Sequence, residues 1–259
     1  MFLADGVMRW QDYSLMFLGL FIAQLGGDYL YYNFTHFHTD PRDSHTKLFA
    51  GWKPFFADKW LAGKRTLYAG LFCLFIDALI GVYFIIKIGW GLALFILAGG
   101  AIALLFTPLM LMGLKEITVF LAFGPLAMMG MAFAMTGRIR AETVAASIPV
   151  GLWVAIVAHL KSANIKSMDE QTGTVTLSTS NITVSVMAIL SYAVLIGGVM
   201  LGYLPKWSLL GLLSIPMMTR VLITLFGIRS TITEYLTPVI ISILALSAGG
   251  LLMAAGYLL

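Results

Sequence analysis

The sequence predicts an all-α polytopic membrane bundle of about eight transmembrane helices, folded as one domain over residues 1–259. Of the 259 residues, 60% are hydrophobic and 11% are charged, whereas soluble domains carry roughly 45–50% apolar and about 25% charged residues. The apolar residues also gather in runs of about 20, the length that a helix needs to cross a hydrocarbon layer of about 30 Å. The single cysteine, Cys73, excludes an internal disulfide and a cysteine-based metal site.

Eight runs meet this length requirement in chain order. They lie near residues 13–32, 65–86, 89–112, 117–135, 143–160, 183–202, 207–226 and 235–257. Most are joined by a few residues only, so consecutive helices are expected to be antiparallel neighbours. Glycines inside the runs let helix backbones approach closely in lipid.

Two connections are long and polar, about 33–64 and 161–182. Placing both on one side gathers most basic residues there: Arg42, Lys47, Lys53, Lys59, Lys64, Arg65, Lys115, Lys161, Lys166 and Arg229. Because cytoplasmic loops carry the excess of Lys and Arg, we expect a multi-pass protein, in the cell membrane, with cytoplasmic long loops. The modest net charge of +4 fits this orientation better than nucleic-acid binding.

Both long connections carry side chains that suit metal and anion binding. The first gathers His36, His38, Asp40, Asp43 and His45, and the second has Lys161, Lys166, Asp169 and Glu170. Carboxylates are the protein ligands that Mg²⁺ prefers, and Lys and Arg bind phosphate directly. Two other interpretations remain open: solvated polar loops, or a transition-metal site in the alternating His36, His38 and Asp40.

Acidic residues also fall within or beside the apolar runs. Asp28 lies late in the first run, Asp77 in the middle of the second, and Glu116 just before the fourth, where it suits a helix N-terminus. A charge at the bilayer centre costs about 2.5–3.5 kcal/mol on insertion scales, so such groups face the bundle interior. Asp77 is therefore either a proton or ion site or a neutral carboxyl hydrogen-bonded to another helix.

The segment 107–137 shows a family pattern: a proline, a short run, Gly and Glu, then Phe-Gly-Pro-Leu and a downstream Thr-Gly. The matching residues are Gly113, Glu116, Phe123, Gly124, Pro125, Leu126, Gly130, Thr136 and Gly137. Matching residues in the first long loop are Asp40, Phe49, Ala50, Gly51 and Trp52. Ile148 to Gly151, in the run before the second long loop, match too and lead without a gap to Asp169, Gly173, Thr176 and Leu177 in that loop. The sequence to about residue 180 resembles the UbiA-type intramembrane prenyltransferases, most closely their 1,4-dihydroxy-2-naphthoate branch.

The resemblance implies a UbiA-like domain with a central cavity. Family members have nine helices, and the first run here aligns with their second, so the first family helix is missing from the pattern. Two Asp-rich motifs bind Mg²⁺, which grips the diphosphate of a polyprenyl donor. The diphosphate leaves, and the allylic cation alkylates an aromatic or other membrane-soluble acceptor, a reaction typical of quinone biosynthesis.

The sequence departs from the family at both motifs. In the first motif, Asn-Asp-x-x-Asp plus a further Asp, only Asp40 remains, and the other positions carry Leu30, Tyr31 and Phe34. In the second, Asn-x-x-Arg-Asp-x-x-x-Asp, Asp169 remains, and the altered positions carry Lys161, Ser162, Asn164 and Ile165. An apolar side chain cannot ligate Mg²⁺, so the usual two-metal site cannot form.

The resemblance therefore implies a degenerate active site. Its expected metal ligands are Asp40, Asp43 and Asp169, and its expected diphosphate contacts are Lys47, Lys53 and Lys161. Two alternatives stay open: a non-catalytic relative that binds an isoprenoid, a quinone or a partner protein, and a small transporter that uses Asp28 and Asp77.

Overall fold

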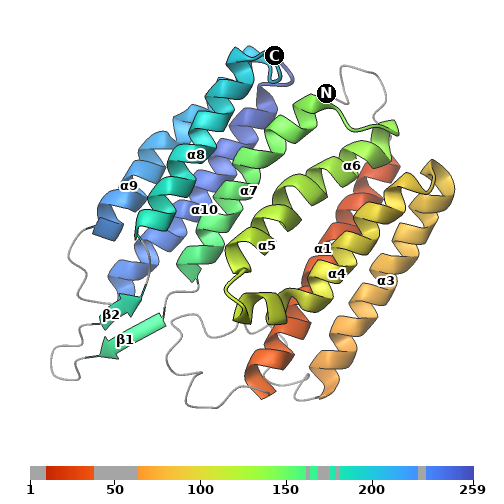
Figure 1. The fold of residues 1–259 in the computed structure, drawn as a ribbon, viewed down its shortest axis with the longest axis horizontal. Coiled ribbons are helices and arrows are strands. Elements are labelled where there is room, and N and C mark those ends of the chain that lie inside the picture. The colour runs from red at the N-terminus through yellow and green to blue at the C-terminus, as the bar shows by residue number, and fades with distance from the viewer. Residues whose placement is uncertain (1–9, 38–63, 162–163, 169–174, 179–180, 227–231) are drawn as a thin grey trace.

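The computed structural model describes residues 10–37, 64–161, 164–168, 175–178, 181–226 and 232–259. Its long elements are antiparallel helices that run between the same two ends of the bundle (Figure 1). Their order is α1 (Trp10–Phe37), α3 (Lys64–Ile88), α4 (Gly91–Leu111), α5 (Lys115–Leu121), α6 (Ala127–Thr136), α7 (Ala141–Lys161), α8 (Asn181–Met200), α9 (Ile215–Phe226) and α10 (Ile232–Ala255).

Seven of the described helical segments are long and apolar enough to cross a membrane. They begin with α3 and α4, continue with the joined segment Lys115–Thr136 and with α7 and α8, and end with Lys206–Phe226 and Thr237–Ala255. The predicted helical membrane bundle is thus confirmed. The first predicted run is helical too, as the 28-residue α1, although Asp12, Gln24 and Asp28 make it more polar than the seven.

The outward faces of these helices are apolar. Large side chains such as Ile86, Leu94, Ile182, Ile189 and Leu251 are each between 68% and 81% exposed. Soluble proteins rarely expose contiguous apolar surface of this extent, and a lipid bilayer covers such faces at no cost in hydrophobic free energy. The protein is therefore a multi-pass integral membrane protein.

One half of the bundle packs α1 against α3 through glycines. A Cβ atom at Gly26 would lie 3.0 Å from Leu74, and one at Gly70 would lie 3.1 Å from the Gly26 carbonyl oxygen. Small residues of this kind allow the close helix approach that membrane bundles use. The buried Asn33 side chain also donates a 2.9 Å hydrogen bond to Thr66 Oγ1, joining the ends of the two helices nearest the first long connection.

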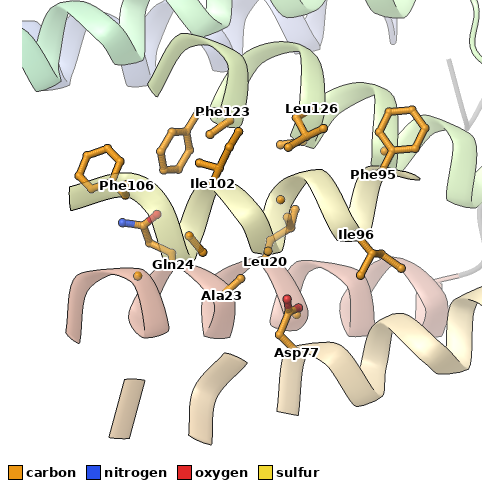
Figure 2. A pocket seen from close by; sticks show the side chains of 18 of the residues that line it. Leu20, Ala23, Gln24, Asp77, Phe95, Ile96, Ile102, Phe106, Phe123 and Leu126 are labelled. Carbon is orange, nitrogen blue, oxygen red and sulfur yellow. The ribbon is translucent and has the colours of Figure 1, made fainter. Parts of the chain in front are cut away.

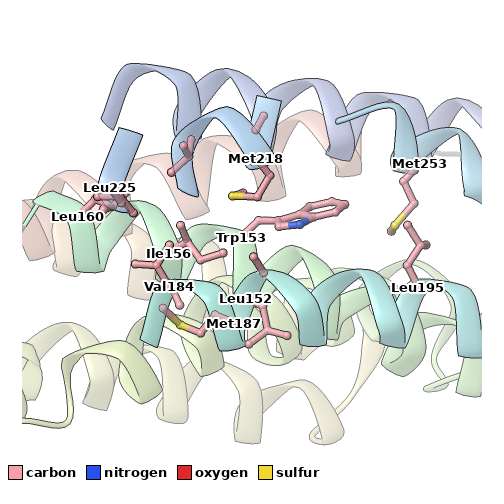
Figure 3. Packing of buried hydrophobic residues seen from close by; sticks show 14 of the residues in the cluster. Leu152, Trp153, Ile156, Leu160, Val184, Met187, Leu195, Met218, Leu225 and Met253 are labelled. Carbon is pink, nitrogen blue, oxygen red and sulfur yellow. The ribbon is translucent and has the colours of Figure 1, made fainter. Parts of the chain in front are cut away.

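The other half is a core formed by α7, α8, α9 and α10 around Trp153 (Figure 3). Trp153 is 1% exposed and lies 5.8 Å, centroid to centroid, from the ring of Tyr192. Tyr192 in turn shares a 2.9 Å hydrogen bond with Ser214. These contacts make α7 the buried centre of this half, since ten of its residues are buried.

Two helices contain irregular segments that the apolar runs alone do not predict. A π-helical turn, Ala122–Leu126, separates α5 from α6 at Pro125, a residue that cannot donate a backbone hydrogen bond. A 3₁₀ segment, Lys206–Ser214, precedes α9. There the backbone of Trp207 lies so close to Gly256 that a Cβ atom at that glycine would clash with it.

The second long connection contains a short antiparallel hairpin, β1 (Asn164–Met168) with β2 (Val175–Ser178). It lies at the same end of the bundle as the C-terminal ends of α1 and α7 and the first residues of α3 and α5 (Figure 1). We call this the loop end of the bundle, and the opposite end the far end.

Candidate functional site

A cavity of about 570 Å³ lies between the two halves of the bundle. Its walls come from α1, α3, α4, the α5–α6 segment and α7, and they are mostly apolar (Figure 2). Lining side chains include Leu20, Phe84, Phe95, Ile96, Phe106, Phe123 and Leu126. Its size falls within the roughly 300–1,000 Å³ of small-molecule sites, which are likewise mainly apolar with a few polar groups.

The loop end of this cavity is polar and charged. Gln24 and Asp28 of α1 line it, and the Gln24 amide donates a 3.0 Å hydrogen bond to Asp28 Oδ1. Lys161, the last residue of α7, lines the same end and interacts electrostatically with Asp28. Lys115, the first residue of α5, also lines the cavity, and its ammonium donates a 2.7 Å hydrogen bond to the carbonyl of Ala158.

A side-chain contact links the helix ends that carry the two lysines. Glu116 Oε1 lies 2.9 Å from Nδ1 of His159, which joins the first turn of α5 to the last turn of α7. The predicted placement of Glu116 in the first turn of a helix is confirmed. Because Lys115 adjoins Glu116 and Lys161 follows His159 by two residues, this pair positions both ammonium groups at the cavity.

Asp77 lies deeper in the cavity, at the middle of α3 (Figure 2). The structure gives it no hydrogen bond or ion pair with any residue that it describes. Of the two alternatives for Asp77, the hydrogen bond to another helix is therefore absent from the described part of the chain. What lies opposite the carboxyl is Gly19 of α1, where a Cβ atom would come within 3.2 Å of Asp77 Oδ1.

Of the predicted site residues, Lys161, Asp28 and Asp77 line this one cavity, and Glu116 stands beside it. The predicted metal ligands and the other two predicted phosphate contacts lie outside the described residues: Asp40, Asp43, Asp169, Lys47 and Lys53. Within the described residues there is no group of three or more His, Cys, Asp and Glu side chains that could hold a metal ion.

Sequence reasoning missed the role of two lining residues, Gln24 and Lys115. A signal for Lys115 was present, because it begins a helix on the same side of the membrane as Lys161. Gln24 carried a weaker signal, since it lies four residues before Asp28 and therefore on the same helical face.

The altered positions of the first motif contribute to packing in this fold. Leu30 is 4% exposed and its side chain lies against Gly70 of α3. Tyr31 lines the cavity and makes an edge-to-face contact with Phe106, with ring centroids 5.8 Å apart. An acidic residue at position 30 would point into the α1–α3 contact, so the packing of the bundle accounts for the apolar residue there.

The fold and the site together define a multi-pass α-helical membrane protein with a mostly apolar cavity that is charged at one end. No protein-family model, no curated protein and no solved structure matches this chain.

Proposed function

We propose that this protein is a membrane-embedded prenyltransferase of the UbiA type with an altered diphosphate site. The observation that carries the proposal is an apolar cavity with two lysines, Lys115 and Lys161, at one end. A polyprenyl diphosphate has matching chemistry, because its chain is entirely apolar and its head is a concentrated negative charge. The resemblance of segment 107–137 to the family supports the same assignment.

In this proposal the isoprenoid chain lies along the phenylalanine-lined wall and the diphosphate lies at the loop end. The lysine ammonium groups bind the diphosphate oxygens through charge-assisted hydrogen bonds. When the bond between the prenyl C1 and the diphosphate oxygen breaks, its electron pair leaves with the diphosphate. The lysines stabilise that developing charge, and an aromatic or lipid acceptor supplies the electrons for the new bond to C1 and releases a proton.

The contribution of Mg²⁺ depends on residues that the structure does not describe. Asp28 accepts a hydrogen bond from Gln24 and interacts electrostatically with Lys161, and Glu116 contacts the His159 ring. These described acids near the cavity do not make up a metal site. We therefore assign diphosphate binding to Lys115 and Lys161. We also propose that Asp40, Asp43 and Asp169 bind a single Mg²⁺ ion.

A second candidate is a non-catalytic relative that binds an isoprenoid or quinone in the same cavity. Leu30 favours it, because a position that is acidic or amidic in the family serves here to pack α1 on α3. The cavity is common to both candidates, so ligand binding alone does not separate them, but turnover does. In either case we propose that the protein lies in the cell membrane with its loop end on the cytoplasmic side, as the basic residues of that end indicate.

The test is binding of geranylgeranyl diphosphate to the purified protein in nanodiscs, with and without Mg²⁺. Lys161→Met is expected to weaken binding about tenfold or more, since a hydrogen bond to a charged group is worth about 1.5–3 kcal/mol. The matched control is Lys206→Met, which removes a lysine from the 3₁₀ segment at the far end and is expected to leave binding unchanged. Asp169→Ala is expected to abolish any part of the affinity that depends on Mg²⁺.

Absence of diphosphate binding in the unaltered protein, or equal binding by the Lys161 and Lys206 variants, would overturn the assignment. Release of diphosphate on addition of an aromatic acceptor separates the transferase from the non-catalytic relative. The latter is expected to bind the diphosphate and leave it intact.

A further inference from the structure

The cavity contains a polar group that the diphosphate assignment does not use. Asp77 lines its wall at the middle of α3, and apolar side chains such as Leu20 and Ile96 line the same cavity (Figure 2). Its carboxyl has no hydrogen bond or ion pair within the described residues. Asp77 is half-buried, and an ionisable group within a membrane span is costly unless it has a partner, so we expect the carboxyl to pair with a group that enters the cavity.

The helix opposite leaves this carboxyl uncovered. Position 19 is a glycine, and any larger residue there would place a Cβ atom within 3.2 Å of Asp77 Oδ1. Gly19 and Asp77 both line the cavity, so the oxygen is open to whatever occupies it. Gly27, on the same helix and also lining the cavity, has nothing within 4 Å of its Cβ position and so covers no such group.

A plain hydrocarbon chain offers no hydrogen-bond partner to the Asp77 carboxyl. An isoprenoid laid over Asp77 would leave its oxygens without a hydrogen-bond partner in an apolar wall, which is unfavourable. We propose that the middle of the cavity is a second polar subsite, in which Asp77 hydrogen-bonds a hydroxyl group on an otherwise apolar ligand.

The helix geometry places this subsite relative to the charged end. Gly19, opposite Asp77, and Asp28 are nine residues apart on α1, which is about 13.5 Å at a rise of about 1.5 Å per residue. A ligand group at Asp77 is therefore distinct from the group held by Lys161. The inference rests on the proposed function to the extent that both place a ligand in this cavity.

The test compares 1-naphthol with 1-methylnaphthalene, two neutral probes that differ by a hydroxyl in place of a methyl group. Their affinities for the protein in nanodiscs are measured against empty nanodiscs, which correct for partition into lipid. The unaltered protein is expected to bind 1-naphthol about tenfold more tightly than 1-methylnaphthalene, because only 1-naphthol can form a hydrogen bond with Asp77. Asp77→Leu is expected to remove this preference and to keep the affinity for 1-methylnaphthalene.

Two glycine variants test the same subsite with the carboxyl left in place. Gly19→Ala is expected to cover Asp77 Oδ1 and to reduce the preference for 1-naphthol, whereas Gly27→Ala is expected to preserve it. These variants decide the matter if Asp77→Leu does not fold. An equal affinity of the unaltered protein for the two probes, or the same preference in the Gly19 and Gly27 variants, would overturn the subsite.

The probes carry no phosphate, so this outcome is independent of diphosphate binding. Loss of geranylgeranyl diphosphate binding with retained hydroxyl preference would remove the proposed function and keep the subsite. Retained geranylgeranyl diphosphate binding with no preference for 1-naphthol would support the diphosphate site and overturn the subsite at Asp77.

Discussion

The contact between Gly124 and Gly151 holds the α5–α6 segment against α7, and Gly124→Ala tests what depends on it. A Cβ atom at Gly124 would lie 2.6 Å from the carbonyl oxygen of Ser147 and 2.8 Å from the Cα of Gly151. Ordinary van der Waals contact begins at 3.4 Å, so the two backbones must separate by about 0.8 Å, from 3.4 minus 2.6. Neither obstacle is a side chain that can rotate away.

Two opposing contributions set the change in the free energy of unfolding that Gly124→Ala causes. Overpacking of this kind costs about 1–3 kcal/mol, and we take the upper end because both obstacles are backbone atoms. Replacing glycine by alanine in a helix stabilises the helix by about 1 kcal/mol. A net loss of about 2 kcal/mol corresponds to a Tm lower by about 4–8 °C for a chain of this size.

The assay is thermal unfolding in detergent followed by circular dichroism, together with diphosphate binding. The matched control is Gly197→Ala in α8, where a Cβ atom would meet nothing within 4 Å and stability should be unchanged or slightly higher. Separation of α5 from α7 is also expected to weaken diphosphate binding, because Lys115 and Lys161 are carried by these two helices. Equal melting temperatures for the two variants would refute the proposed close packing at Gly124.

Three further substitutions test individual polar contacts. Thr66→Val is expected to lower stability by about 1–3 kcal/mol, because it leaves the buried Asn33 amide without its 2.9 Å hydrogen bond; equal unfolding curves would contradict this. Asp12→Asn removes the charge of a buried carboxyl that pairs with Lys87, so a lower Tm is expected; equal melting temperatures would contradict this. His159→Ala breaks the contact between α5 and α7 and is expected to weaken geranylgeranyl diphosphate binding with a smaller effect on Tm; unchanged binding would show that the pair does not position the lysines.

The sequence by itself determined which segments are helical, because that depends on properties local to each run. The run predicted at 65–86 is α3, Lys64–Ile88, and the run at 143–160 is α7, Ala141–Lys161. Length and hydropathy suffice here, since a chain in lipid must satisfy its backbone hydrogen bonds within each spanning segment. The same local reasoning placed Glu116 in the first turn of a helix.

The tertiary structure alone decided what the helices enclose. Asp28 and Lys161 line the same end of a cavity although 133 positions separate them, and no local pattern encodes which helix faces lie together. The open space over Asp77 exists because Gly19 of another helix lies opposite it. The close approach of the 3₁₀ segment to Gly256 is likewise a contact between segments distant in the chain. Side-chain neighbours across a membrane bundle are set by how several helices pack at once, and the site is a product of that packing.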